Sequence, residues 1–165
     1  MNEELKDSIV KMDSKEPISK DIAEDISGRS LIFYDGVCGL CNHFVKFVLS
    51  NTADKPFVFA SLQSEFASKR LQRHGIKAAD LDTVYVQVDG GEPDSKVLSR
   101  SDAIVHILRG LKAPMPQFAT ILNIIPRPLR DLGYRLVAKI RYRLFGKYDT
   151  CLLPSAGEAE KFIEI

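Results

Sequence analysis

The sequence predicts an α/β domain in which a mixed sheet of four strands carries helices on both faces. Apolar or β-branched runs of four to six residues alternate with segments of helical periodicity, in the order β-α-β-α-β-β-α. A helical segment joins the first two strands, which should therefore be parallel, whereas a tight turn joins the last two, which should be antiparallel. The length of 165 residues, 45% of them hydrophobic, is enough for one such domain.

Four runs have the composition of strands: residues 31–34, 57–60, 83–88 and 96–99. The first run reads Leu-Ile-Phe-Tyr, and Asp35-Gly36 ends it with a turn signal. The sequence Asp89-Gly90-Gly91 lies between the last two runs, which predicts a hairpin.

Helical periodicity follows the first, second and fourth strands. After the first strand, apolar residues recur at helical spacing to about residue 50. A second helix is predicted over residues 65–74, where Gly75 suits the position just past its end. A third helix should open at Ser99, because Asp102 lies at the spacing of a capping box.

Charge divides the chain into three segments. Residues 1–28 hold eight acidic residues and four lysines and are expected to form a flexible N-terminal tail. Residues 29–111 contain the predicted sheet and its helices. Residues 112–165 form a C-terminal extension, in which residues 112–147 carry eight basic residues against one aspartate.

Additional helices are predicted in this extension, among them a basic helix over residues 129–145. Its apolar residues Leu132, Leu136, Ile140 and Leu144 follow four-residue steps and should pack on the core, with the basic side chains in solvent. The alternative is that this helix makes peripheral contact with anionic lipid or an acidic partner.

Net charge and hydropathy exclude several function classes. The formal net charge of +1 gives no reason to expect nucleic acid as a partner. The longest stretch without a charged side chain is 14 residues, 113–126, whereas a membrane-spanning helix needs about 20. No apolar segment follows residues 1–6, so we expect no signal peptide and a cytoplasmic protein.

Cys38 and Cys41 have the Cys-x-x-Cys spacing and lie between the first strand and the first helix. Both sulfurs should lie in the first turn of that helix, close enough to form a disulfide. The unpaired N–H groups of a helix N-terminus stabilise a thiolate, so Cys38 should have a lowered pKa and act as the nucleophile. Cys41 should be less exposed and act as the resolving thiol, and Gly39 should leave room for the backbone of a partner.

This arrangement predicts a thiol–disulfide oxidoreductase of the protein-disulfide reductase type. The Cys38 thiolate attacks a substrate disulfide, and Cys41 then resolves the mixed disulfide and releases the reduced substrate. The substrate would be a disulfide-containing protein or a small thiol compound, and an external reductant must restore the dithiol. The cycle needs no organic cofactor and no metal.

The string Asp-x-x-Cys-x-x-Cys at residues 35–41 is similar to the motif of the DCC family of thiol–disulfide oxidoreductases. The order of the predicted elements also resembles the thioredoxin fold. Further strings similar to that family are residues 34–36, 101–103 and 141–146, the last followed by Cys151. The resemblance covers residues 31–152 and implies a thioredoxin-like fold and disulfide oxidoreductase activity, without a particular substrate.

One feature departs from thioredoxins, which have a cis proline just before the third strand. This chain has no proline between Pro56 and Pro93, and residues 79–82 before the third strand read Ala-Asp-Leu-Asp. Without a proline ring beside the sulfurs, a metal ion could reach them more easily.

Asp35 has two interpretations. Its carboxylate could accept the proton of Cys41, which would make Asp35 catalytic together with the two cysteines. It could instead form an Asx turn with Gly36 that sets the shape of the loop.

The remaining candidates define two alternative functions. A zinc-binding module would combine Cys38, Cys41, Cys151 and one histidine, although a single cysteine such as Cys151 is more often a small buried hydrophobe. A non-catalytic thioredoxin-like adaptor would bind partners through the basic helix. His43 is expected to have a surface or packing role.

No function is assigned to His74 or His106. Arg141 and Arg143 are expected in solvent, with the acidic tail, Asp35 or a substrate as the other partners considered.

Overall fold

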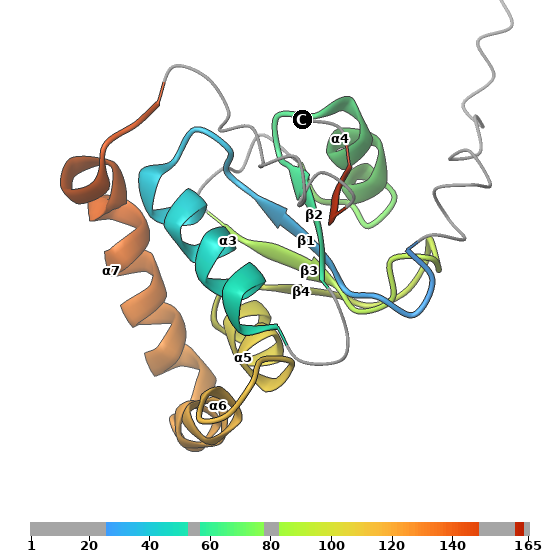
Figure 1. The fold of residues 1–165 in the computed structure, drawn as a ribbon. Helices are drawn as coiled ribbons and strands as arrows, with labels where there is room; N and C mark the ends of the chain where they lie inside the picture. Colours follow the sequence, from blue (N-terminus) through green and yellow to red (C-terminus); the bar gives the residue numbers. More distant parts are fainter. Residues whose placement is uncertain (1–25, 53–56, 78–82, 149–160, 164–165) are drawn as a thin grey trace, which may run out of the picture.

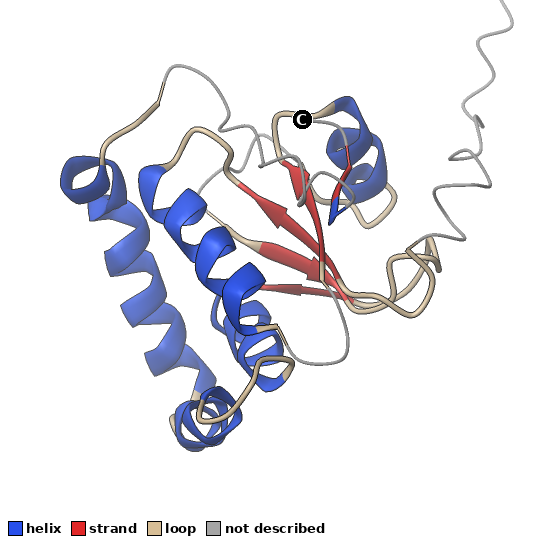
Figure 2. Cartoon of the chain, in the orientation of Figure 1, coloured by secondary structure: helices blue, strands red, loops and turns tan. Residues whose placement is uncertain are grey.

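A mixed β-sheet forms the centre of the fold, with helices against both of its faces (Figures 1 and 2). The structure is a computed structural model and describes residues 26–52, 57–77, 83–148 and 161–163. The elements are β1 (Leu31–Tyr34), α3 (Gly39–Asn51), β2 (Val58–Ser61), α4 (Glu65–Gln72), β3 (Tyr85–Gln87), β4 (Val97–Ser99), α5 (Arg100–Arg109), α6 (Met115–Ile124), α7 (Arg127–Phe145) and β5 (Phe162–Ile163).

The strand pairing confirms the predicted fold class. β1 and β2 are parallel and connected through α3, whereas β3 and β4 are antiparallel and connected by a short turn. β1 also pairs with β3 in antiparallel orientation, so that β1 lies in the middle of the sheet. The strand order in the described residues is β4-β3-β1-β2-β5.

The sheet has five strands in the described residues, one more than the four predicted. β5 lies next to β2 in parallel orientation, with Phe162 paired to Phe59. The Phe162 ring stacks on the Phe59 ring at a centroid distance of 5.3 Å. A strand of two residues is too short for a recognisable alternation of apolar and polar side chains, which is why the sequence did not reveal it.

Alternation along β1 divides the core into two layers. Ile32 and Tyr34 face α3 and α5, whereas Leu31 and Phe33 face α4 on the other side of the sheet. Ile26 is buried in the α4 layer although it belongs to the segment expected to form the tail. Residues 1–25 of that segment lie outside the described part.

Side-chain capping is present at the starts of α3 and α4 and absent at the starts of α5, α6 and α7. The Ser64 hydroxyl accepts a hydrogen bond from the Ala67 N–H at the start of α4. Ser99 takes the N-cap position of α5, but its side chain makes no capping hydrogen bond, contrary to the expected capping box. Asp102 instead forms ion pairs with Arg127 and Arg130 at the start of α7, both at 2.9 Å.

The C-terminal extension differs most from expectation. Additional helices were predicted here, but only one was given bounds: α6 precedes it, and α7 begins before the expected residue 129. The four apolar residues of the predicted stripe are exposed to solvent rather than packed on the core, with Leu132 and Leu136 each 62% exposed. The other face of α7 packs against α3 and α5 (Figure 1). On that face Tyr134 and Arg141 make polar contacts with Val84 and Asp35, and Ala138 adds apolar surface. No helix among the described residues is long and apolar enough to cross a membrane.

Candidate active site

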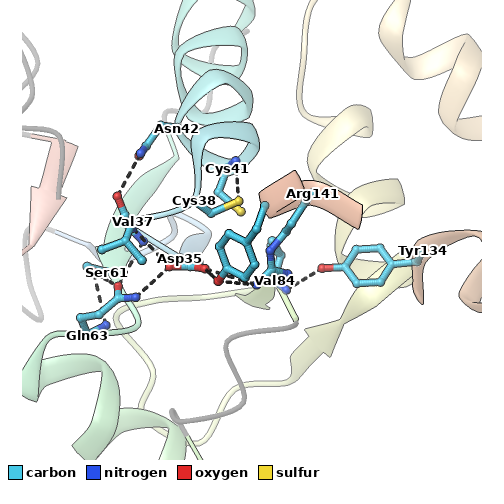
Figure 3. Close-up of polar contacts among 12 residues, drawn as sticks. Asp35, Val37, Cys38, Cys41, Asn42, Ser61, Gln63, Val84, Tyr134 and Arg141 are labelled. Carbon is cyan, nitrogen blue, oxygen red and sulfur yellow. Dashed lines mark hydrogen bonds and ion pairs between the residues drawn. The ribbon is translucent and has the colours of Figure 1, made fainter. Parts of the chain in front are cut away.

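The loop between β1 and α3 is held by side-chain hydrogen bonds. The Asp35 carboxylate accepts from the Val37 N–H at 3.2 Å, which is the Asx-type turn considered for this residue. Gln63, in the loop after β2, accepts from the Gly36 N–H at 3.1 Å. The Asn42 amide donates to the Gly36 carbonyl at 2.9 Å, so the loop is fixed from three directions (Figure 3).

Cys38 is the N-cap of α3 and Cys41 lies in its first turn, as the spacing predicts. The Cys38 sulfur accepts a hydrogen bond from the Cys41 N–H at 3.5 Å. Both thiols are free, and Cys38 is 0% exposed while Cys41 is 8% exposed. The expectation that Cys41 would be the less exposed of the two is therefore wrong.

A short segment that we call the strap, residues 146–148, covers Cys38. The Gly39 N–H donates to the Gly146 carbonyl at 3.2 Å, and the Tyr148 N–H donates to the Val37 carbonyl at 2.8 Å. A Cβ atom at Gly39 would lie 2.1 Å from the Phe145 carbonyl oxygen. The space at Gly39 that was expected to admit a partner is thus occupied by the chain's own backbone.

Asp35 and Arg141 form a buried ion pair beside the cysteines. The side chains are 1% and 4% exposed, and Arg141 Nη2 lies 3.2 Å from Asp35 Oδ2. The Tyr142 hydroxyl donates to the same oxygen, and Gln63 donates to Oδ1 at 2.8 Å. The guanidinium of Arg141 also lies over the Tyr142 ring, 4.6 Å from its centroid.

This ion pair corrects the expectation that Arg141 is exposed, although Asp35 was among the partners considered. Arg143 is exposed, as expected. Gln63, Tyr142 and Tyr134 were not recognised as site residues. Only the resemblance string at 141–146 drew attention to this part of α7.

The surroundings shift the pKa values of the two thiols in opposite directions. A hydrogen bond from the Cys41 thiol lowers the pKa of Cys38 from 9.0 to about 6, against the effect of burial. The Cys41 N–H and the positive charge of Arg141 act in the same direction, whereas the charge of Asp35 opposes them. The pKa of Cys41 is raised, because its proton is shared with Cys38 and because it is buried. At neutral pH the pair is therefore a Cys38 thiolate with a Cys41 thiol.

An apolar cavity of about 250 Å³ lies next to Cys41. Its lining comes from α3, α5, α7 and Val84, the residue before β3. The Val84 N–H donates to the Tyr134 hydroxyl at 2.8 Å, which joins α7 to that end of β3. Burial raises the pKa of Tyr134 to about 12, so the phenol stays neutral. The loop of residues 79–82, which lacks the thioredoxin proline, lies outside the described part.

The histidines make local contacts. His43 Nδ1 lies 2.8 Å from the Gly39 carbonyl, and the ring is exposed, as expected. His74 contacts the Pro93 carbonyl at 3.0 Å, and the half-buried His106 contacts the Ser30 hydroxyl at 2.9 Å.

The described ranges contain no cluster of three or more His, Cys, Asp or Glu side chains placed to hold a metal ion. The zinc alternative also needs Cys151, which lies outside those ranges.

Comparison with known proteins identifies the family. The sequence matches the DCC1-like thiol-disulfide oxidoreductase family over residues 32–147. The chain belongs to this family. It is 35% identical to the uncharacterized protein YuxK of Bacillus subtilis over 142 residues, 86% of this chain and 98% of that protein.

A plant relative is also similar. The chain is 37% identical over 125 residues to a DCC family protein of Arabidopsis thaliana whose name describes it as chloroplastic. The match covers 76% of this chain and 70% of the plant protein. No solved structure matches the chain. The resemblance noted in the sequence is therefore confirmed at the level of the family.

Proposed function

We propose that this protein is a thiol–disulfide oxidoreductase of the protein-disulfide reductase type, with Cys38 as the attacking thiol and Cys41 as the resolving thiol. The observation that carries the proposal is the position of the Cys38 sulfur at the start of α3, where it accepts the Cys41 N–H. The lowered pKa of Cys38 and the family membership support it.

The reaction is a two-electron exchange. The Cys38 thiolate attacks one sulfur of a substrate disulfide, forms a mixed disulfide and expels the other substrate sulfur as a thiolate. Cys41 then loses its proton and attacks the Cys38 sulfur, which releases the second substrate thiolate and leaves a Cys38–Cys41 disulfide. An external dithiol reductant reverses this oxidation and restores both thiols.

Access to Cys38 requires a change at the strap. Cys38 is 0% exposed, whereas Cys41 borders the apolar cavity. In our proposal residues 146–148 move away when a substrate binds, which frees the Gly39 N–H and the Val37 carbonyl. These two backbone groups can then pair with the extended backbone of a protein substrate.

In this proposal Asp35 acts on the cysteines through its charge and through the loop that it holds. Val37, Gln63, Arg141 and Tyr142 all donate hydrogen bonds to its two carboxylate oxygens. These contacts favour a positioning role over the role of a base that takes the proton of Cys41. The Asp35→Asn variant separates the two roles, because the base role predicts slower resolution of a mixed disulfide, whereas the effect of the charge on Cys38 predicts only a lower Cys38 pKa.

The test is a titration of free thiols in graded dithiothreitol redox buffers, with zinc measured on the same sample. Two thiols should be lost together at one midpoint, and mass spectrometry should locate the bond between Cys38 and Cys41. The matched control is Cys151→Ser, which should leave that midpoint unchanged. Reduction of an insulin disulfide that survives Cys38→Ser would refute the mechanism.

Unreactive thiols with one zinc ion per chain would favour the metal-binding alternative instead. The Cys41→Ser variant adds a positive result, since it should accumulate a mixed disulfide on Cys38. The cytoplasm remains our expected location, on the grounds of cysteine usage in a reducing compartment.

A further inference from the structure

The polarity of α7 is inverted with respect to the domain. The face that contacts the core carries the Tyr134 hydroxyl, bonded to Val84, and the Arg141 guanidinium, bonded to Asp35. The outer face carries leucines, of which Leu136 is 62% and Leu144 is 66% exposed. A helix attached to a soluble domain normally has the opposite arrangement.

α6 continues this apolar surface. Its residue Ile124 is 78% exposed, and Ala119 is the only buried residue of this helix. Of the 13 exposed large hydrophobic residues in the described ranges, 11 lie between residues 118 and 145. They are Phe118, Ile121, Ile124, Ile125, Leu129, Leu132, Leu136, Val137, Ile140, Leu144 and Phe145. Single exposed apolar residues are ordinary, but such a concentration on two consecutive helices marks an interaction surface.

Positive charge lies directly beside the leucines. Arg135, Lys139 and Arg143 are exposed and follow four-residue steps along α7. At 100° per residue, this row lies next to the row that contains Leu132 and Leu136. Residues 103–148 contain nine Lys and Arg and a single acidic residue, Asp131.

The carboxylate of Asp131 is hydrogen-bonded within the domain. Asp131 accepts a hydrogen bond from the Ser101 hydroxyl at 2.5 Å, on the inner side of α7. The outer surface of α6 and α7 thus combines aliphatic side chains with basic ones and presents no carboxylate. This is the pattern of a helix that lies in the plane of a membrane, with its apolar side among the acyl chains and its basic side chains at the phosphates.

We propose that α6 and α7 form a peripheral docking surface for anionic membranes. α7 would lie along the bilayer surface with Leu132 and Leu136 inserted and with Lys139 and Arg143 at the lipid phosphates. The strap follows the C-terminal end of α7, so in this orientation the Cys38–Cys41 pair would lie on the inner side of that helix, about one helix diameter from the membrane surface. The inference is independent of the redox chemistry proposed for the two thiols.

The test is sedimentation of the full chain with phosphatidylcholine vesicles that contain phosphatidylglycerol, compared with phosphatidylcholine alone. Binding should require the anionic lipid and should weaken with added salt. Leu132→Asp/Leu136→Asp should reduce binding by about 100-fold or more, because two inserted leucines are lost. Lys139→Glu should reduce it by about 30-fold, at about 1 kcal/mol for each unit of charge near the surface.

The matched control is Lys77→Glu, which makes the same change of charge at an exposed site after α4, on the other face of the sheet. This variant should bind as the unaltered protein does. Circular dichroism and the redox midpoint of each variant should be unchanged, which separates lost docking from lost folding or lost chemistry.

Four results would overturn the proposal. The first is equal binding to neutral vesicles, and the second is anionic binding that the two leucine substitutions leave intact. The third combines two observations: the protein does not bind vesicles, and it sediments as a dimer that Leu132→Asp/Leu136→Asp converts to a monomer. The surface would then contact a second copy of the chain. The fourth is vesicle binding by a variant that lacks residues 2–25 but not by the full chain. The N-terminal segment would then cover the surface, and the full chain would not dock on membranes by itself.

Discussion

The buried ion pair between Asp35 and Arg141 leads to a prediction with opposite signs for its two members. The charge of Arg141 lowers the pKa of Cys38, and the charge of Asp35 raises it. Arg141→Met should therefore raise that pKa, whereas Asp35→Asn should lower it further. A substitution that only loosened the site would shift the pKa in the same direction in both variants.

The size of the shift follows from the order of the contributions. Cys38 changes from 9.0 to about 6, and both contacts from Cys41 act more strongly than Arg141 does. We expect a contribution of about one pKa unit from the arginine, which ranks below both contacts from Cys41. In Arg141→Met the midpoint should lie near pH 7, and the thiolate fraction at pH 6 should fall from about one half to about one tenth.

The rate at neutral pH is a poor measure of this change. At pH 7 the thiolate fraction falls only from about 90% to about 50%, while the intrinsic nucleophilicity of the thiolate rises about three-fold per unit of pKa. The two effects oppose each other and leave a net change in rate of less than about two-fold. The assay should therefore follow the ultraviolet absorbance of the thiolate across pH, with mass spectrometry of alkylated Cys38 to identify the residue.

Folding provides the control for these variants. Removal of one member of a buried ion pair costs about 3–5 kcal/mol because the other charge stays buried. The double variant Asp35→Asn/Arg141→Met removes both charges and should recover much of that loss, with a Cys38 pKa between those of the single variants. An unchanged midpoint in folded Arg141→Met would refute the role of the arginine and leave the contacts from Cys41 as the whole cause.

Three further predictions concern packing, access and pH. Gly39→Ala should lower the free energy of unfolding by about 1–3 kcal/mol, because its Cβ would meet the Phe145 carbonyl at 2.1 Å. Gly133→Ala is the matched control in α7, where no atom lies within 4 Å, and it should be neutral or stabilising in the same denaturant titration. Tyr148→Pro removes an N–H that holds the strap and should speed alkylation of Cys38 without a change in its pKa; an unchanged rate would contradict movement of the strap. The reduced protein should gain about 2 kcal/mol of stability between pH 6 and pH 8, since a lowered folded pKa gives stability that is lost as pH falls through about 6. Cys38→Ser should remove that gain, and a gain that persists in this variant would assign it to another group.

The sequence predicted those parts of the fold that depend on neighbouring residues. The four longer strands, their parallel and antiparallel pairing and the position of Cys38 at the start of α3 all follow from local patterns. The Asx turn at Asp35 is also local, because its acceptor and donor lie two residues apart.

The contacts that complete the site join distant parts of the chain. Asp35 and Arg141 are 106 residues apart, and Val84 and Tyr134 are 50 residues apart. A pattern of charges along one helix does not specify which arginine meets a carboxylate in another element. The exposure of the two cysteines was predicted wrongly for the same reason, because the strap that covers Cys38 comes from the far end of α7.

The orientation of α7 shows how these polar contacts outweigh the apolar stripe. Burial of the partly exposed Leu132 and Leu136 would contribute about 1–2 kcal/mol each. A half-turn rotation that buried them would withdraw Arg141 from Asp35 and leave a buried carboxylate without its cation, at a cost of about 3–5 kcal/mol. It would also separate the Tyr134 hydroxyl from the Val84 N–H. The arginine that lowers the pKa of Cys38 therefore belongs to the same ion pair that keeps the leucines on the outside. Any substitution that breaks it should change both the acidity of the thiol and the exposure of the apolar surface.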